Sequence, residues 1–168
     1  MTTAQPSRVN IYELIERREI EIVFQPIVSI RRGAIVGVEA LSRGLSSNGR
    51  QIQPIQLFKL AKIAGLTDEL DRLCRITAIE NFLSLYAANP ELILFINVDP
   101  AAIDEIATGS DSLLSFLEQK SLNPRNIAIE IIEEEFSNST QLEEIVSLNK
   151  EHGFLTVLDN VGVGHSNL

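Results

Sequence analysis

Cysteine, tryptophan and histidine are scarce in this chain: of 168 residues, one is cysteine, none is tryptophan and two are histidine. Cys74 cannot form a disulfide within the chain, and one thiol with two imidazoles does not make a zinc cluster. Its simplest interpretation is a small buried apolar side chain, rather than a reactive thiol, in a reducing compartment. We therefore expect a cytoplasmic protein without disulfide bonds or structural zinc.

Long apolar runs and excess positive charge are also missing. No segment approaches the roughly 18 consecutive apolar residues of a membrane-spanning helix, and the N-terminal sequence MTTAQPSRVN does not resemble a signal peptide. Acidic residues outnumber basic ones by 23 to 14, which leaves a net charge of −9. Such a surface repels polyanions and argues against binding to nucleic-acid polymers. A small phosphorylated ligand stays compatible, because a bound metal ion reverses the local field.

The pattern of apolar residues predicts one α/β domain after a flexible segment at residues 1–10. Two β-branched segments, 20–30 and 34–43, are separated by a short turn and therefore form an antiparallel hairpin. Residues 44–54 are typical of a loop. Helical patterns then alternate with strands at 92–97, 127–132 and 154–159. This alternation is typical of βαβ units and a parallel sheet.

Four polar residues interrupt these apolar strands at or near their carboxyl ends: Glu39, Asn97, Glu130 and Asp159. The last three are separated by about one βα unit each, so we expect them on consecutive parallel strands at nearly the same level. The carboxyl ends of such strands carry the site in α/β folds. Each residue taken alone is equally typical of a helix cap, a solvated strand end or an ion pair. Together they favour a hard divalent cation such as Mg²⁺, Mn²⁺ or Ca²⁺.

These residues lie in segments that resemble the EAL domain, a bacterial module associated with hydrolysis of cyclic di-GMP. Five motifs stand in the order and at the spacing of that family: FQPIV (24–28), VEALSRG (38–44), FINVDP (95–100), IEIIEEE (129–135) and LDNVGVGHSNL (158–168). The resemblance runs from about residue 11 to residue 168. It implies a modified TIM barrel with an antiparallel first strand, of which residues 11–168 would form the N-terminal part, about five of eight strands.

The resemblance also implies roles for individual residues. It implies metal ligands at Glu39, Asn97, Glu130 and Asp159, and substrate contacts at Gln25, Leu41 and Arg43. The metal would be Mg²⁺ or Mn²⁺, with Ca²⁺ as an inhibitory substitute. The guanidinium of Arg43 suits a phosphodiester oxygen pair, although it is also typical of a solvated strand-end cation.

The chain departs from the family pattern in two places. Asn160 replaces the second Asp of the family's D-D-F-G-T-G loop, and an amide is a weaker ligand for a second metal ion than a carboxylate. The Lys near the attacking water has no counterpart in the 168 residues, so we assign no catalytic residue. We expect this stretch alone to be inactive and its open sheet edge to favour a homodimer.

Three functions stay open on these grounds. The intact parent protein, with further regulatory domains, would hydrolyse cyclic di-GMP to the linear dinucleotide. A degenerate EAL module would instead bind cyclic di-GMP or a protein partner without hydrolysis, which the Asn160 substitution favours. A pure dimerisation scaffold is the third, although it would leave the strand-end residues unexplained.

Overall fold

The computed structural model describes residues 9–46, 49–98, 113–132 and 139–159. The chain divides into two compact units, one formed by Met1–Val23 and Leu41–Glu80 and the other by Phe24–Ala40 and Asn81–Leu168. Strands β1 (Ile20–Ser29) and β2 (Ala34–Leu45) and helix α3 (Thr67–Ala88) each contribute residues to both units. Each unit is described by itself below.

In the first unit, short helices and one short strand lie against the end of β2. Helix α1 (Ile11–Glu16) is capped by Asn10, whose Oδ1 accepts a hydrogen bond of 3.1 Å from the Tyr12 amide. Helix α2 (Pro54–Ala64) starts with a proline and ends at Gly65, which adopts a left-handed φ of 69°. Strand β3 (Gln51–Ile52) pairs antiparallel with β2 in a segment that the sequence predicted to be loop. Two residues are too few for a hydrophobic alternation, which explains the difference.

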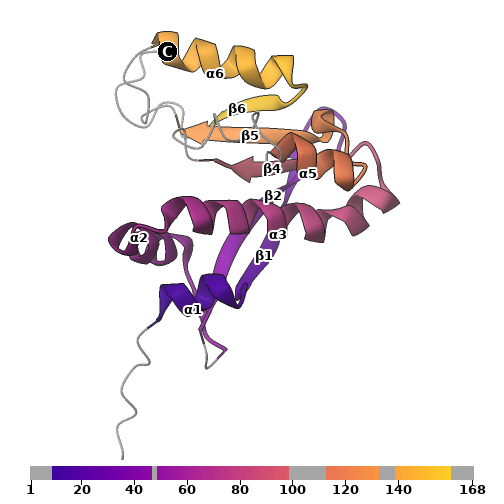
Figure 1. Ribbon diagram of the computed structural model, residues 1–168. Coiled ribbons are helices and arrows are strands. Elements are labelled where there is room, and N and C mark those ends of the chain that lie inside the picture. Colours follow the sequence, from indigo (N-terminus) through magenta and orange to yellow (C-terminus); the bar gives the residue numbers. More distant parts are fainter. Residues whose placement is uncertain (1–8, 47–48, 99–112, 133–138, 160–168) are drawn as a thin grey trace, which may run out of the picture. The chain divides into compact units, whose positions relative to one another are not determined.

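The second unit contains the parallel strands β4 (Ile93–Asn97), β5 (Ile127–Ile132) and β6 (Leu155–Asp159). The order of strands in the sheet is β1-β2-β4-β5-β6, with β3 paired to β2 (Figure 1). Parallel pairing joins β2 to β4, β4 to β5 and β5 to β6. Between β1 and β2 there is only a tight turn, closed by a 2.8 Å hydrogen bond from the Gly33 amide to the Ser29 carbonyl, so β1 runs antiparallel to β2.

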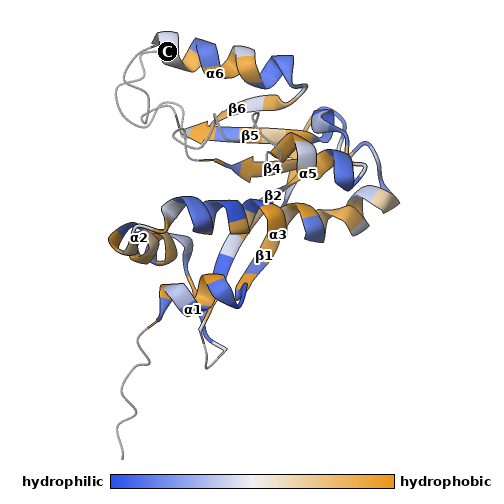
Figure 2. Cartoon of the chain, viewed as in Figure 1, coloured by the Kyte–Doolittle hydropathy of each residue, from blue (hydrophilic) through white to orange (hydrophobic). Residues whose placement is uncertain are grey.

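The strand order confirms the predicted α/β fold with an antiparallel hairpin strand followed by parallel strands. Strand β5 lies between β4 and β6, and Ile127, Ala128, Ile129 and Ile131 on it are fully buried. Figure 2 shows β5 as a largely apolar ribbon with a hydrophilic band near its arrowhead, and Glu130 is the one charged residue of this strand. The strands form an open sheet in the described part of the chain, so the barrel is incomplete there.

The helices of the second unit are α5 (Leu113–Gln119) and α6 (Ser139–Glu151), with a 3₁₀ turn, η2 (Pro124–Asn126), before β5. A predicted helix at about 100–107 and most of the predicted flexible N-terminus lie outside the described residues. Val146 on α6 is 38% exposed. Within the described ranges, no helix combines the length and apolar character needed to cross a bilayer.

Candidate metal site at the strand ends

The strand register brings the four predicted metal ligands to one face of the sheet. Asn97 on β4 lies directly opposite Glu130 on β5. Glu39 on β2 pairs with Phe95, two residues before Asn97, and Asp159 on β6 pairs with Ile132, two residues after Glu130. Since side chains alternate between faces along a strand, offsets of two residues keep all four on the same face.

The four residues are therefore staggered. The sequence predicted Asn97, Glu130 and Asp159 at nearly the same level, which is right for Asn97 and Glu130 but not for Asp159. Each two-residue step displaces a side chain by about 6.6 Å along the strand direction, at about 3.3 Å per residue. A staggered register is what tilted strands of a barrel produce. The spacing of residues along the sequence cannot reveal it, because loops and helices of different lengths give the same register.

Asn97 links the two carboxylates beside it. Its Nδ2 donates hydrogen bonds to Glu39 Oε1 at 3.4 Å and to Glu130 Oε2 at 3.3 Å. The backbones are also joined at this point, because the Val98 amide donates a 3.2 Å hydrogen bond to the Glu130 carbonyl. The amide group thus stands between two negative charges on neighbouring strands and reduces their repulsion.

Glu130 is the most strongly perturbed carboxyl group of the site. It is 9% exposed, among the fully buried side chains of β5. Burial, as the largest cause, together with the negative charges of Glu39 and Asp159, raises the pKa of Glu130 to about 7. Without a bound cation, Glu130 therefore titrates near neutral pH, where an ordinary glutamate is ionised.

The donors present suit a hard cation, although they do not form a closed cage. Two ion pairs in the described part of the chain, Arg18–Glu80 and Asp71–Arg75, do not include Glu39, Asn97 or Glu130. No three His, Cys, Asp or Glu side chains of the described ranges are grouped closely enough to hold a metal ion by themselves. The chemistry nevertheless fits: a buried carboxyl group is destabilised by two like charges, and a divalent cation would relieve that repulsion. Rotation of the Asn97 amide would turn Oδ1 instead of Nδ2 toward the carboxylates.

Asp159 is exposed at the end of β6, at the last described position of the chain. Its charge reaches Glu130 strongly enough to raise the pKa of that group. Asn160, predicted as a weak ligand for a second metal ion, lies outside the described residues.

The residues predicted to contact substrate are spread over both units. Gln25 is exposed on β1 in the second unit. Leu41 and Arg43 lie on β2 in the first unit and are half-buried. The Nη1 atom of Arg43 donates a 2.8 Å hydrogen bond to the carbonyl of Ser42. The sequence analysis did not single out Ser42, because one serine inside a strand pattern carries no signal of its own.

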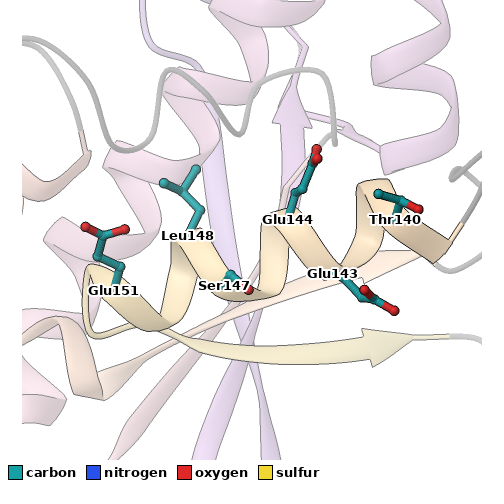
Figure 3. Close-up of a pocket in the computed structure, with 6 residues that line it drawn as sticks. All are labelled: Thr140, Glu143, Glu144, Ser147, Leu148 and Glu151. Atoms are coloured by element: carbon teal, nitrogen blue, oxygen red, sulfur yellow. The ribbon is translucent and has the colours of Figure 1, made fainter.

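A separate hollow of about 420 Å³ lies along α6 and contains none of these residues. Figure 3 shows its lining, which comes from successive turns of that helix: Thr140, Glu143, Glu144, Ser147, Leu148 and Glu151. Three carboxylates on one solvated helix face, without a basic group among the lining residues, would repel a phosphorylated ligand. The better candidate site is the sheet face where the buried Glu130 is subject to the negative charges of Glu39 and Asp159.

The hairpin strand and the parallel strands define the class of protein: a barrel-type α/β domain, here with an open sheet in the described part of the chain. Within that class, the chain belongs to the family described as the EAL domain, whose sequence profile matches residues 8–168.

Two relatives from Escherichia coli (strain K12) illustrate the similarity. The probable cyclic di-GMP phosphodiesterase PdeB is 31% identical over 156 residues, which is 93% of this chain and 30% of that protein. The probable cyclic di-GMP phosphodiesterase PdeI is 30% identical over 164 residues, covering 95% of this chain and 21% of that protein. The chain thus spans less than a third of the length of these two relatives.

Solved structures show the same fold. The PaMucR phosphodiesterase in its c-di-GMP complex superposes with a TM-score of 0.79 at 24% identity, covering 94% of this chain and 64% of that one. The FimX EAL domain from Pseudomonas aeruginosa bound to c-di-GMP superposes with a TM-score of 0.72 at 22% identity, covering 92% and 62%. These superpositions confirm the EAL-type barrel fold, here incomplete.

Proposed function

We propose that the natural protein containing this chain is a metal-dependent phosphodiesterase that hydrolyses cyclic di-GMP to the linear dinucleotide. The observation that carries the proposal is the contact of Asn97, at the end of β4, with both Glu39 and Glu130 on the adjacent parallel strands β2 and β5. Membership of the EAL family and similarity to PdeB, which is named a probable cyclic di-GMP phosphodiesterase, support the substrate.

The proposed metal ligands are Glu39, Asn97, Glu130 and Asp159, with Asn160 as a weak additional donor. When bound, the metal ions would polarise the phosphodiester and lower the pKa of a water molecule. The oxygen donors suit Mg²⁺ or Mn²⁺, and Ca²⁺ would compete for the same oxygens. Glu130 must lose its proton to bind the cation, so ion binding releases protons.

Substrate binding would use Arg43, with Gln25 and Leu41 as further contacts. A guanidinium presents paired N–H donors that match two oxygens of a phosphodiester. Only Nη1 of Arg43 is engaged by the Ser42 carbonyl in the contact described above, which leaves the other guanidinium nitrogens for a phosphate.

The proposal extends to the surroundings of the domain. A reducing compartment such as the cytoplasm agrees with the free and buried thiol of Cys74. Two-fold homodimers are the commonest assembly of soluble proteins, and we propose one here. Further regulatory domains agree with the much greater length of PdeB and PdeI.

The decisive experiment incubates the intact natural protein with cyclic di-GMP and Mn²⁺ and separates the products by chromatography. We expect the linear dinucleotide in Mn²⁺ or Mg²⁺, and binding without turnover in Ca²⁺. Glu39→Ala should abolish turnover, whereas Glu143→Ala, on the exposed face of α6, should not. Binding without turnover under every metal condition would instead establish a receptor, and absence of both would refute the proposal.

A further inference from the structure

Several consecutive residues of β2 around Arg43 form hydrogen bonds or strand pairs within the first compact unit. Arg43 donates from Nη1 to the Ser42 carbonyl at 2.8 Å, so its side chain folds along the strand. The Leu45 amide donates to the Glu19 carbonyl at 2.8 Å. Gly44 pairs with Ile52 of β3. All of these residues belong to the first compact unit.

Cys74 on helix α3 interacts with the same segment of β2. Its thiol lies near the side chain of Ser42, which acts against burial by lowering the pKa of the thiol, and Cys74 is 7% exposed. Asp71 and Arg75, one helical turn apart on α3, form a buried ion pair, and Cys74 lies between them in the sequence. Burial raises the pKa of Cys74 to about 11, so the thiol keeps its proton near neutral pH and acts as a neutral hydrogen-bonding group.

At Gly44, the same segment of β2 packs closely against helices α1 and α2. A methyl group built on Gly44 would lie 3.0 Å from Leu57 Cδ1, 3.1 Å from Leu14 Cδ1 and 3.3 Å from Ile52 Cβ. Leu14 and Leu57 are buried core residues, so the missing side chain lets the strand backbone pack directly on them. Arg43 is thus held between a hydrogen-bonded residue and a closely packed glycine.

We propose that Cys74 and Gly44 are positioning residues, which hold β2 at Ser42 and Gly44 and so direct the guanidinium of Arg43 toward a phosphate of the substrate. This rests on the proposed function, from which the phosphate contact of Arg43 is taken. A free arginine side chain loses about 2 kcal/mol of rotamer entropy when it is immobilised. Because β2 is held in place and the Arg43 side chain is already hydrogen-bonded to the Ser42 carbonyl, part of this rotamer entropy is lost before the ligand binds.

The test compares variants of the intact natural protein for their affinity for cyclic di-GMP in Ca²⁺, where turnover does not interfere. Cys74→Val replaces the thiol by an apolar, branched side chain and removes the polar contact with Ser42, and Gly44→Ala displaces the packing. Each should weaken affinity about tenfold, because small displacements of a ligand-binding side chain carry costs of this order. Cys74→Ser keeps a hydrogen-bonding group and should bind within about twofold of the wild type.

A control separates positioning from general loss of stability. Ile79→Val shortens a fully buried side chain of α3 in the same unit and should lower stability by about 1 kcal/mol. Its affinity for cyclic di-GMP should nevertheless match that of the wild type. Equal affinity of Cys74→Val, Gly44→Ala and the wild type would overturn the proposal.

A second measurement does not depend on the function. In the unliganded protein, ¹⁵N relaxation of the Nε–H group should show Arg43 more ordered than the exposed Arg31. Cys74→Val should lower that order and Cys74→Ser should restore it. If the wild type does not bind cyclic di-GMP, the proposed function fails, while this measurement still decides on the positioning. If Arg43 is equally ordered in the wild type and in Cys74→Val, the inference is overturned whatever the affinity measurements show.

Discussion

Asn97 and Glu130 lie directly opposite each other on two parallel strands, and the amide of the first donates to the carboxyl group of the second at 3.3 Å. The same amide reaches Glu39 on the other side at 3.4 Å. Asn97 therefore holds together carboxylates that repel each other, in a place where a cation would do so more strongly. The testable consequences concern this repulsion, the packing beneath it and the buried thiol.

Glu130→Gln should stabilise the metal-free protein above neutral pH. Because the folded-state pKa of Glu130 is raised from 4.5 to about 7, its contribution to stability is fully present below pH 4.5 and is lost as pH rises through 7. A glutamine is not subject to this loss, so we expect a gain of roughly 1–3 kcal/mol at pH 8 and little gain at pH 4.5. Urea unfolding in EDTA at the two pH values measures the difference.

Glu144→Gln on α6 is the matched control, because it removes one carboxylate from an exposed helix face. It should change the unfolding free energy by less than about 0.5 kcal/mol at either pH. A pH-independent difference between Glu130→Gln and the wild type would show that Glu130 is not destabilised by its surroundings.

Asn97→Asp should lower the stability of the metal-free protein and raise its affinity for a divalent cation. A third carboxylate beside Glu39 and Glu130 removes two hydrogen bonds and adds repulsion, so the metal-free protein should lose about 1–3 kcal/mol. A carboxylate is also a stronger ligand for a hard cation than an amide. Thermal unfolding with increasing Mn²⁺ should therefore show a larger rise in Tm for the variant than for the wild type.

Asn81→Asp, at an exposed position of α3, supplies the comparison for the added charge. Its rise in Tm with Mn²⁺ should equal that of the wild type. If Asn97→Asp responds to Mn²⁺ no more than Asn81→Asp does, position 97 is not a ligand.

Gly37→Ala should disrupt the pairing of β2 with β4 next to Glu39. A methyl group at Gly37 would collide with the Phe95 ring and lie 2.7 Å from the Ile93 carbonyl oxygen, and Ile93 is the residue with which Gly37 pairs. We expect a loss of about 2–3 kcal/mol, as for an overpacked core. Gly33→Ala meets no atom within 4 Å but forces alanine to a φ of 61°, and should cost about 1 kcal/mol.

Chemical denaturation of both glycine variants provides the comparison. Gly37→Ala should also weaken Mn²⁺ binding, because it moves the strand that carries Glu39, whereas Gly33→Ala should not. Equal destabilisation by the two substitutions would contradict the close approach of β2 and β4.

The thiol of Cys74 should react slowly in the folded protein. Burial raises its pKa from 9.0 to about 11, which lowers the thiolate fraction at pH 8 about a hundredfold even before access is considered. The associated stability is present below pH 9 and is lost as pH rises through 11. Reaction with a chromogenic disulfide should be at least about a hundredfold slower in buffer than in urea, and equal rates would mean an accessible thiol.

Much of the fold follows from local patterns in the sequence. The segments 127–132 and 92–97 are short and apolar, and they appear as β5 and β4 with bounds that differ by at most one residue. The helix that ends at Gly65 ends there because a left-handed φ of 69° suits glycine. Strand β3 was missed, since its two residues form a strand only through pairing with β2.

The sequence by itself determined which residues stand at strand ends, and that they are acidic or amide side chains among apolar neighbours. Strand length and hydrophobic pattern are local properties, so Glu39, Asn97, Glu130 and Asp159 could be named without coordinates. Only the tertiary structure decided their stagger and the bridging amide of Asn97, and with them the raised pKa of Glu130. The physical reason is that register and burial depend on how distant strands pair, and electrostatic repulsion depends on the distances that this pairing sets.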